Sequence, residues 1–137
     1  MKSSRIIAEK LLVNRKNPEA GINDYKIICF KGKPKVIIVD VDRYIGHKRN
    51  FYDCEWNYLG VESDCCSFGD KLPKPKNLDR MLEVASILSE DFPHVRVDLY
   101  DIDDKIIFGE LTFYPWSGYV QFTPDSFDYE LGKDFDI

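Results

Sequence analysis

The fold predicted for this chain rests on two stretches near its C-terminal end, which read VRVDLY at residues 95–100 and FGELTFYPWSG at residues 108–118. Successive side chains of a strand point to opposite faces, so Arg96 and Asp98 share one face of the first stretch and its aliphatic residues share the other. Glu110 and Thr112 share a face of the second stretch in the same way. The alternation predicts two adjacent strands, each with a polar and an apolar face.

The spacing allows Asp98 and Glu110 to face each other across these strands. They pair directly in a regular hairpin whose loop has an odd number of residues, as a loop of Asp103, Asp104 and Lys105 has, and a bulge in one strand has the same effect. Two facing carboxylates repel each other, and a bound cation relieves that repulsion. Because hard oxygen ligands suit Mg²⁺, the pair predicts a magnesium site.

Length and composition predict one domain over residues 1–137, with enough apolar side chains for a core. The 137 residues are 44% hydrophobic and carry a net charge of −5. That charge argues against a nucleic-acid partner, because nucleic-acid-binding domains concentrate positive charge. No apolar run approaches the roughly 20 residues of a membrane span, and the N-terminal apolar stretch is too short for a signal peptide. We therefore expect a cytoplasmic protein.

The four cysteines follow neither a metal-binding nor a disulfide pattern. No C-x-x-C pair occurs, and Cys65 and Cys66 are adjacent. Cys29 alternates within an apolar run and is expected in the core. Neither His47 nor His94 lies near a second ligand type at metal spacing. The pattern predicts structural roles for the cysteines and surface or strand-edge positions for the two histidines.

The rest of the chain predicts an α+β fold, with an antiparallel sheet and one main helix. Residues 25–30 and 35–41 are rich in β-forming side chains and are joined by the turn sequence KGKP, which predicts a hairpin. Apolar residues recur at helical spacing from Leu78 towards Asp91, after Asn77 as a suitable N-cap. This segment is the predicted helix.

Three other segments have weaker patterns. Residues 6–13 are predicted to be a strand that leaves one lobe and enters another. Residues 44–76 have no sustained period and are predicted to form a long loop across a face of the sheet. From Tyr119 onward, aromatic and acidic residues alternate irregularly, which predicts a loosely structured end packed by its aromatic side chains.

Several motifs together resemble one family: DYK at residues 24–26, FKG at 30–32, Arg43, RVDLY at 96–100 and GELTFYP at 109–115. They are similar to the TupA-like ATP-grasp family of bacterial cell-surface polysaccharide and polymer biosynthesis. The likeness runs from about residue 6 to about residue 132 but covers only the C-terminal half of such an enzyme. We expect the N-terminal lobe, with its glycine-rich phosphate loop and lysine, to be absent from this chain and supplied by a partner if at all.

The resemblance implies a metal site and a residue for phosphoryl transfer. Asp98 and Glu110 would bridge Mg²⁺ to the phosphates of ATP, and Thr112 stands where an asparagine commonly completes the ligands. Arg96 would hold the transferring phosphoryl group or an acyl-phosphate oxygen. The alternative is that Arg96 only neutralises the neighbouring carboxylates.

The resemblance also implies a nucleotide site. A segment similar to the inter-lobe hinge, whose backbone would read the adenine edge, consists of Glu9, Lys10, Leu11 and Leu12. Asp24 and Lys26 would address the ribose and a phosphate respectively, although a solvated strand face is the alternative. From its place at the end of an apolar strand, Arg43 would put positive charge where an anionic substrate docks, and a solvated loop is the alternative.

The implied reaction is ATP-dependent ligation of a carboxylate to an amine, with ATP and Mg²⁺ as cofactors and a small molecule or polymer precursor as substrate. The chain by itself is expected to be inactive. Two alternatives are open. One is a non-catalytic module that binds nucleotide or a partner, and the other is a glycosyltransferase-like domain whose D-x-D element is Asp40 and Asp42.

Overall fold

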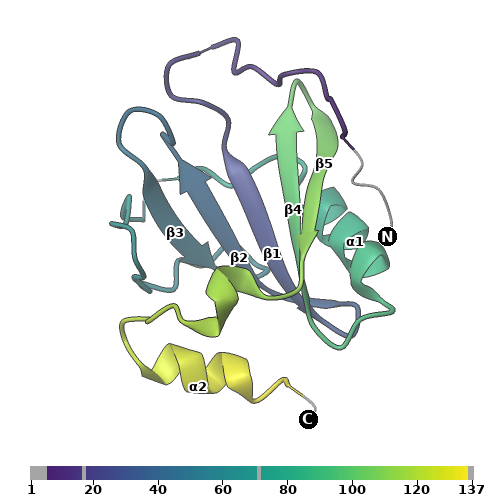
Figure 1. The fold of residues 1–137 in the computed structure, drawn as a ribbon. Helices are drawn as coiled ribbons and strands as arrows, with labels where there is room; N and C mark the ends of the chain where they lie inside the picture. The colour runs from purple at the N-terminus through teal and green to yellow at the C-terminus, as the bar shows by residue number, and fades with distance from the viewer. Residues whose placement is uncertain (1–5, 17, 71, 136–137) are drawn as a thin grey trace.

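Five antiparallel strands form one sheet in the order β3-β2-β1-β4-β5 in the computed structural model, which describes residues 6–16, 18–70 and 72–135. The strands are β1 (Asp24–Phe30), β2 (Lys33–Val41), β3 (Lys48–Tyr52), β4 (Val95–Ile102) and β5 (Lys105–Thr112). The helices are α1 (Leu78–Ser89), the short 3-10 turn η1 (Pro115–Gly118) and α2 (Ser126–Gly132). The predicted α+β class is confirmed, with α1 against one face of the sheet and the C-terminal segment against the other (Figure 1).

The predicted hairpin of β1 and β2 is confirmed. Its two-residue turn has positive φ at both central positions, +47° at Lys31 and +76° at Gly32, which matches the twist of the strands. The turn lies against α1, because the hydroxyl of Ser86 donates to the carbonyl of Gly32 at 2.5 Å. The hairpin is therefore fixed to the helix as well as to the sheet.

The hairpin of β4 and β5 also has a two-residue turn, at Asp103 and Asp104, where φ is +52° and +60°. The predicted three-residue loop is wrong, because Lys105 already pairs with Ile102. Aspartate is among the residues that accept this left-handed conformation most readily. With this turn and a regular ladder, Asp98 would not face a carboxylate.

A β-bulge in β5 restores the predicted pairing. Leu99 pairs with Phe108 and Asp98 pairs with Glu110, which leaves Gly109 as the extra residue. A Cβ at Gly109 would lie 3.0 Å from the backbone oxygen of Asp98, so the close approach of the strands favours glycine. The prediction that the two carboxylates lie on the same side of the sheet is confirmed, through a bulge rather than through the loop.

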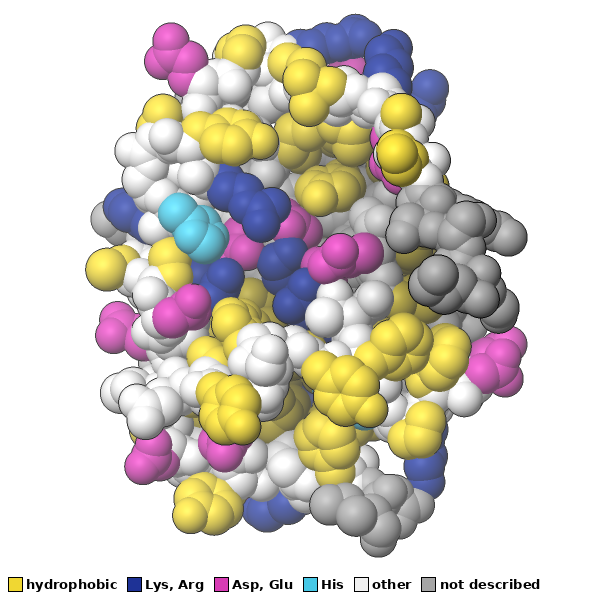
Figure 2. Space-filling view, in the orientation of Figure 1, with side chains coloured by type: hydrophobic (Ala, Val, Ile, Leu, Met, Phe, Trp, Pro, Cys, Tyr) yellow, Lys and Arg dark blue, Asp and Glu magenta, His cyan; other side chains and the backbone are white. Residues whose placement is uncertain are grey.

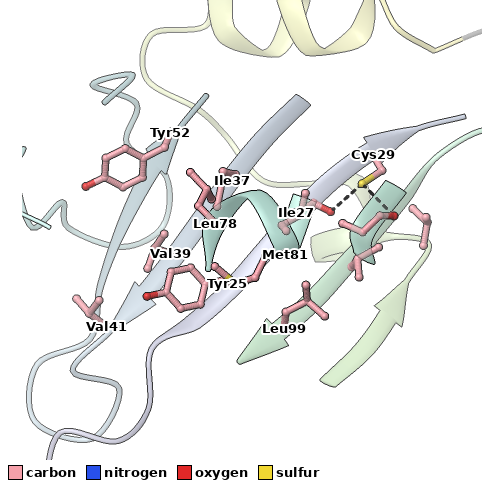
Figure 3. Packing of buried hydrophobic residues seen from close by; sticks show 13 residues of the cluster. Tyr25, Ile27, Cys29, Ile37, Val39, Val41, Tyr52, Leu78, Met81 and Leu99 are labelled. Atoms are coloured by element: carbon pink, nitrogen blue, oxygen red, sulfur yellow. Dashed lines mark hydrogen bonds between the residues drawn. The ribbon is translucent and has the colours of Figure 1, made fainter. Parts of the chain in front are cut away.

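The main core lies between the sheet and α1 (Figure 3). α1 contributes Leu78, Met81 and Ala85 to this core. Cys29 is buried there as predicted, and burial raises the pKa of its thiol to about 11. Asn77 takes the N-cap position, but its side chain donates to Asp101 at 2.9 Å instead of capping the helix. The predicted helix therefore starts as expected, without the predicted cap bond.

A second core lies on the opposite face of the sheet, under the C-terminal segment. It consists of Ile28, Phe30, Val36, Ile38, Phe51, Val61 and Phe122. The ring of Phe122 lies 5.8 Å from that of Phe51 and 5.0 Å from that of Phe127. The predicted aromatic packing of the chain end is confirmed, but the end is not loose, because it contains α2.

Two predicted segments differ from the structure. The loop predicted over residues 44–76 contains β3, whose Arg49 and Phe51 face one side and whose Asn50 and Tyr52 face the other. Both sides are covered, so the strand lacks the apolar and polar alternation of a half-exposed strand. Residues 6–14 form no strand, since no ladder pairs them with a described strand, and they pass the turn end of β4 and β5 (Figure 1). No helix in the described ranges is long and apolar enough to cross a membrane.

Candidate functional site

The face of the sheet opposite α1 is divided into an apolar part and a charged part. The apolar part is the second core, and next to it each strand contributes charged or polar side chains (Figure 2). We call this group the charged face: Asp24, Lys26, Asp40, Arg49, Arg96, Asp98, Glu110 and Thr112. The first six of these are buried. Burial of charge is costly unless each charge is paired, so the arrangement of ion pairs decides what this face can bind.

Arg96 connects the two predicted metal carboxylates. Its Nε and Nη2 donate to Oδ1 and Oδ2 of Asp98, both at 2.7 Å. The same Nη2 donates to Glu110 Oε1 at 3.2 Å and to Thr112 Oγ1 at 3.0 Å. Thr112 in turn donates to Glu110 Oε1 at 3.0 Å. The structure therefore brings together all four residues that the motif R-x-D…E-x-T predicted.

Lys26 lies on β1, the central strand of the sheet, and bridges two carboxylates. Its Nζ donates to Asp24 Oδ2, and it donates to Asp98 Oδ2 at 3.0 Å. Arg43 Nη1 lies 3.4 Å from the same Asp24 oxygen. The other oxygen, Asp24 Oδ1, is buried and has no hydrogen-bond partner among the described residues. Burial raises the pKa of Asp24, and the ion pair with Lys26 opposes that rise.

Asp40 forms the other end of the charged face with Arg49. Arg49 donates to Asp40 through Nε at 2.6 Å and through Nη2 at 3.2 Å, and its Nη1 donates to Asp64 at 2.5 Å. Burial alone would raise the pKa of Asp40, but the contacts with Arg49 outweigh it and lower that pKa. Asp42 lies beyond the end of β2, and neither Asp40 nor Asp42 lines the cavities beside the charged face, so the geometry does not favour the D-x-D metal role.

Trp116 joins the two arginines of the charged face. Its ring lies 5.0 Å from the Cζ of Arg49 and 5.8 Å from the Cζ of Arg96, within cation–π range. Trp116 and Ser117 have φ near +50°, a conformation that is uncommon for residues other than glycine. The sequence reasoning missed the roles of Trp116 and Asp64. The available signal for Trp116 was its place in the turn that follows β5, the strand that carries Glu110.

Two cavities open beside the charged face. The smaller has a volume of about 220 Å³ and is lined by Glu9, Leu12, Asp24, Lys26, Arg43, Asp98, Tyr100, Phe108, Gly109 and Glu110. The larger, of about 490 Å³, is lined by Lys10 and Leu11 among others and shares four lining residues with the smaller one: Glu9, Leu12, Arg43 and Tyr100. The structure thus brings the predicted hinge segment next to the predicted metal, ribose and phosphate residues. Arg96 and Thr112 line neither cavity and contact Glu110 from the side.

The family model of the TupA-like ATP-grasp proteins matches residues 1–136. The chain belongs to the TupA-like ATP-grasp family. No curated protein and no solved structure gives a significant match. The family membership supports an ATP-grasp-related function and, in general terms, the use of ATP with a divalent metal ion.

The donor atoms of the charged face fit a hard divalent cation in type. Asp98, Glu110 and Thr112 offer oxygen atoms only, on neighbouring positions of β4 and β5. In the described part of the chain, no three acidic, histidine or cysteine side chains converge as a complete metal site. The two carboxylates of Asp98 and Glu110 suit Mg²⁺, which commonly takes one or two protein carboxylates and fills its shell with water and phosphate oxygens. A magnesium ion would therefore be held here by Asp98 and Glu110, with Thr112 as a neutral neighbour.

Proposed function

We propose that the charged face and its two cavities form half of a Mg·ATP site in an ATP-dependent carboxylate–amine ligase of cell-surface polymer biosynthesis. The observation that carries the proposal is the direct pairing of Asp98 with Glu110 beside Arg96, at the edge of a cavity that the hinge segment also lines. Family membership supplies the ATP-grasp context. The ligation and the polymer setting are inferences from the family resemblance.

The larger cavity is the proposed adenine site. Its volume of about 490 Å³ lies within the range of small-molecule pockets, roughly 300–1,000 Å³. Leu11 and Leu12 would supply apolar surface for a ring, while the backbone of residues 9–12, which belongs to no described helix or strand, would supply donors and acceptors for its edge. The ribose and phosphates would then extend into the smaller cavity, towards Asp24 and Lys26.

Arg96 and Arg43 are the proposed residues for the reacting phosphoryl group and an anionic substrate. A carboxylate oxygen of the substrate attacks the γ-phosphorus and ADP leaves; an amine nitrogen then attacks the acyl carbon and phosphate leaves. Bound Mg²⁺ would neutralise phosphate charge. Arg96 is oriented for its part by the two bonds to Asp98, and such positioning supplies most of the catalysis in phosphoryl transfer.

We propose that a second lobe completes the site. The smaller cavity is bordered by a segment that leaves apolar side chains in solvent, with Ile6 96%, Ile7 82% and Leu11 79% exposed. A lobe that covers these side chains would also exclude water from the phosphates. Residues 1–137 by themselves are therefore expected to bind Mg·ATP weakly and to show neither ligase nor ATPase turnover.

The substitution Glu110→Gln tests the proposal with little risk to the fold, because the Glu110 side chain is 65% exposed. Loss of one charge-assisted contact, worth about 1.5–3 kcal/mol, is expected to weaken Mg·ATP binding roughly 10- to 150-fold. Titration of the ¹⁵N-labelled chain with Mg·ATP, followed by NMR, measures the affinity and locates the shifts.

The matched control is Glu130→Gln on α2, where the side chain is 64% exposed and far along the chain from the cavities. This variant is expected to bind Mg·ATP as the wild type does. Equal affinities for Glu110→Gln and wild type would contradict the proposed site. Robust ATP turnover by the wild-type chain would contradict the need for a second lobe.

A further inference from the structure

Lys26 occupies the position that a metal ion would be expected to take between carboxylates. Its ammonium donates to Asp24 and, at 3.0 Å, to Asp98, and it lies 4.0 Å from Asp40. The side chain is only 8% exposed. A buried ammonium held by two carboxylates is a resident cation of this site.

The carboxylates of the smaller cavity that belong to the charged face are already compensated. Asp24 pairs with Lys26 and Arg43, Asp98 pairs with Lys26 and Arg96, and Glu110 pairs with Arg96. Glu9 lines the same cavity but is exposed to solvent. A free divalent cation would have to leave its water for carboxylates that already have cations, and Mg²⁺ gives up water reluctantly.

A metal ion that arrives with a polyphosphate meets different electrostatics. The phosphate oxygens bring negative charge and fill much of the metal's coordination shell. They also offer the ammonium of Lys26 and the guanidinium groups new partners of opposite charge. Lys26 and the arginines repel the free metal ion, and they therefore attract its complex with phosphate.

Asp24 provides a second, independent observation. Its Oδ1 is buried and has no hydrogen-bond partner in the described chain, while its Oδ2 accepts from Lys26. A buried oxygen without a partner is costly, and Asp24 is one of the residues that line the smaller cavity, so a donor or a cation that reached this oxygen would satisfy it. Lys26 binds the other oxygen of Asp24 and so occupies the position between Asp24 and Asp98 that a metal ion would take.

We propose that Lys26 determines the selectivity of this site: it excludes free divalent metal ions and admits the metal only as a complex with the phosphates of a nucleotide. The inference rests on the proposed Mg·ATP site but concerns a separate property, which is the order in which metal and nucleotide enter. Replacement of the lysine by a neutral side chain is expected to convert the carboxylates into a site for free metal.

The experiment compares wild type, Lys26→Met and Lys35→Met, with Mn²⁺ as the probe and paramagnetic broadening of NMR signals as the readout. Lys35 lies near the start of β2 and pairs with Asp134. Its substitution therefore controls for the loss of one positive charge. Wild type and Lys35→Met are expected to show broadening of Asp98 and Glu110 signals with Mn·ATP but not with Mn²⁺ alone.

Lys26→Met is expected to bind free Mn²⁺ at least about tenfold more tightly than wild type, because a unit positive charge a few ångströms away is removed. Saturable broadening of these signals in wild type by Mn²⁺ alone, or no gain in Lys26→Met, would overturn the inference. If Lys26→Met does not fold, the wild-type comparison of Mn²⁺ with Mn·ATP decides. If Lys26→Met gains binding of free Mn²⁺ but wild type binds no Mn·ATP, the proposed nucleotide site is refuted. The exclusion of free metal by Lys26 is then supported by itself.

Discussion

Each buried charged side chain of the charged face depends on an ion-pair partner. Asp40 is 1% exposed and both of its oxygens accept from Arg49, which also reaches Asp64. Such a pair adds little stability when compared with apolar residues of the same size, but loss of one partner leaves an unpaired buried charge. The pair therefore fixes β2 to β3 and holds Arg49 against Trp116.

The substitution Asp40→Asn is expected to lower the free energy of unfolding by about 3–5 kcal/mol at pH 7, since Arg49 loses its main counter-charge. The contacts with Arg49 lower the pKa of Asp40 below its usual 3.8, so the stabilisation is present above pH 3.8 and is lost as the pH falls through the lowered pKa. Urea denaturation across this range should show the difference between variant and wild type shrinking in acid. The exposed Asp91→Asn is the control, and a difference that persists at the lowest pH would contradict the assigned ion pair.

At the scale of elements, the bulge in β5 decides which side chains meet. Without the extra residue, the two-residue turn would place Asp98 opposite Gly109 instead of Glu110. Gly109 lies close to its neighbours, since a Cβ there would be 3.0 Å from the Asp98 oxygen and 3.1 Å from the Tyr100 ring. The bulge thus sets the distance between β4 and β5 at the site.

The substitution Gly109→Ala is expected to destabilise the fold by about 1–3 kcal/mol, because the backbone of Asp98 cannot move away as a flexible side chain can. Thermal and urea denaturation measure the change, and NMR shifts of Glu110 and Asp98 report the altered pairing. The control is Gly132→Ala, where a Cβ would meet nothing within 4 Å. An unchanged stability and unchanged shifts for Gly109→Ala would show that the bulge does not need glycine.

At the scale of the whole molecule, the sheet supports two cores that meet the charged face. α1 covers one side, and the C-terminal segment covers the apolar part of the other side. Trp116, Phe122 and Phe127 connect that segment to Phe51 and to the arginines. The C-terminal segment is therefore both a cover for the second core and a support for the site.

The substitution Phe122→Ala is expected to cost about 3–5 kcal/mol of stability, because a buried ring between Phe51 and Phe127 is removed. Urea denaturation measures this loss. The control Tyr129→Ala removes an aromatic ring of α2 that is 76% exposed and should change stability by no more than about 0.5 kcal/mol. Similar small effects for both variants would show that the C-terminal segment is not part of the folded unit.

The sequence by itself determined the hairpin of β1 and β2, the helix α1, the polar face of Arg96 and Asp98, and the family resemblance that the family model bears out. These features depend on local alternation and turn residues, which the chain carries in a few consecutive positions. The sequence did not reveal β3, because both sides of that strand are covered and its pattern lacks alternation.

Only the tertiary structure decided how the charges pair. An odd loop and a bulge give the same parity, so spacing could not choose between them, and only the folded chain shows a two-residue turn with a bulge at Gly109. The bond of Lys26 to Asp98 joins residues that are 72 positions apart, and it exists because β1 pairs with β4 as well as β2. A charge in the sequence does not specify its partner, because Coulomb energy depends on distances and burial that arise only when the sheet forms.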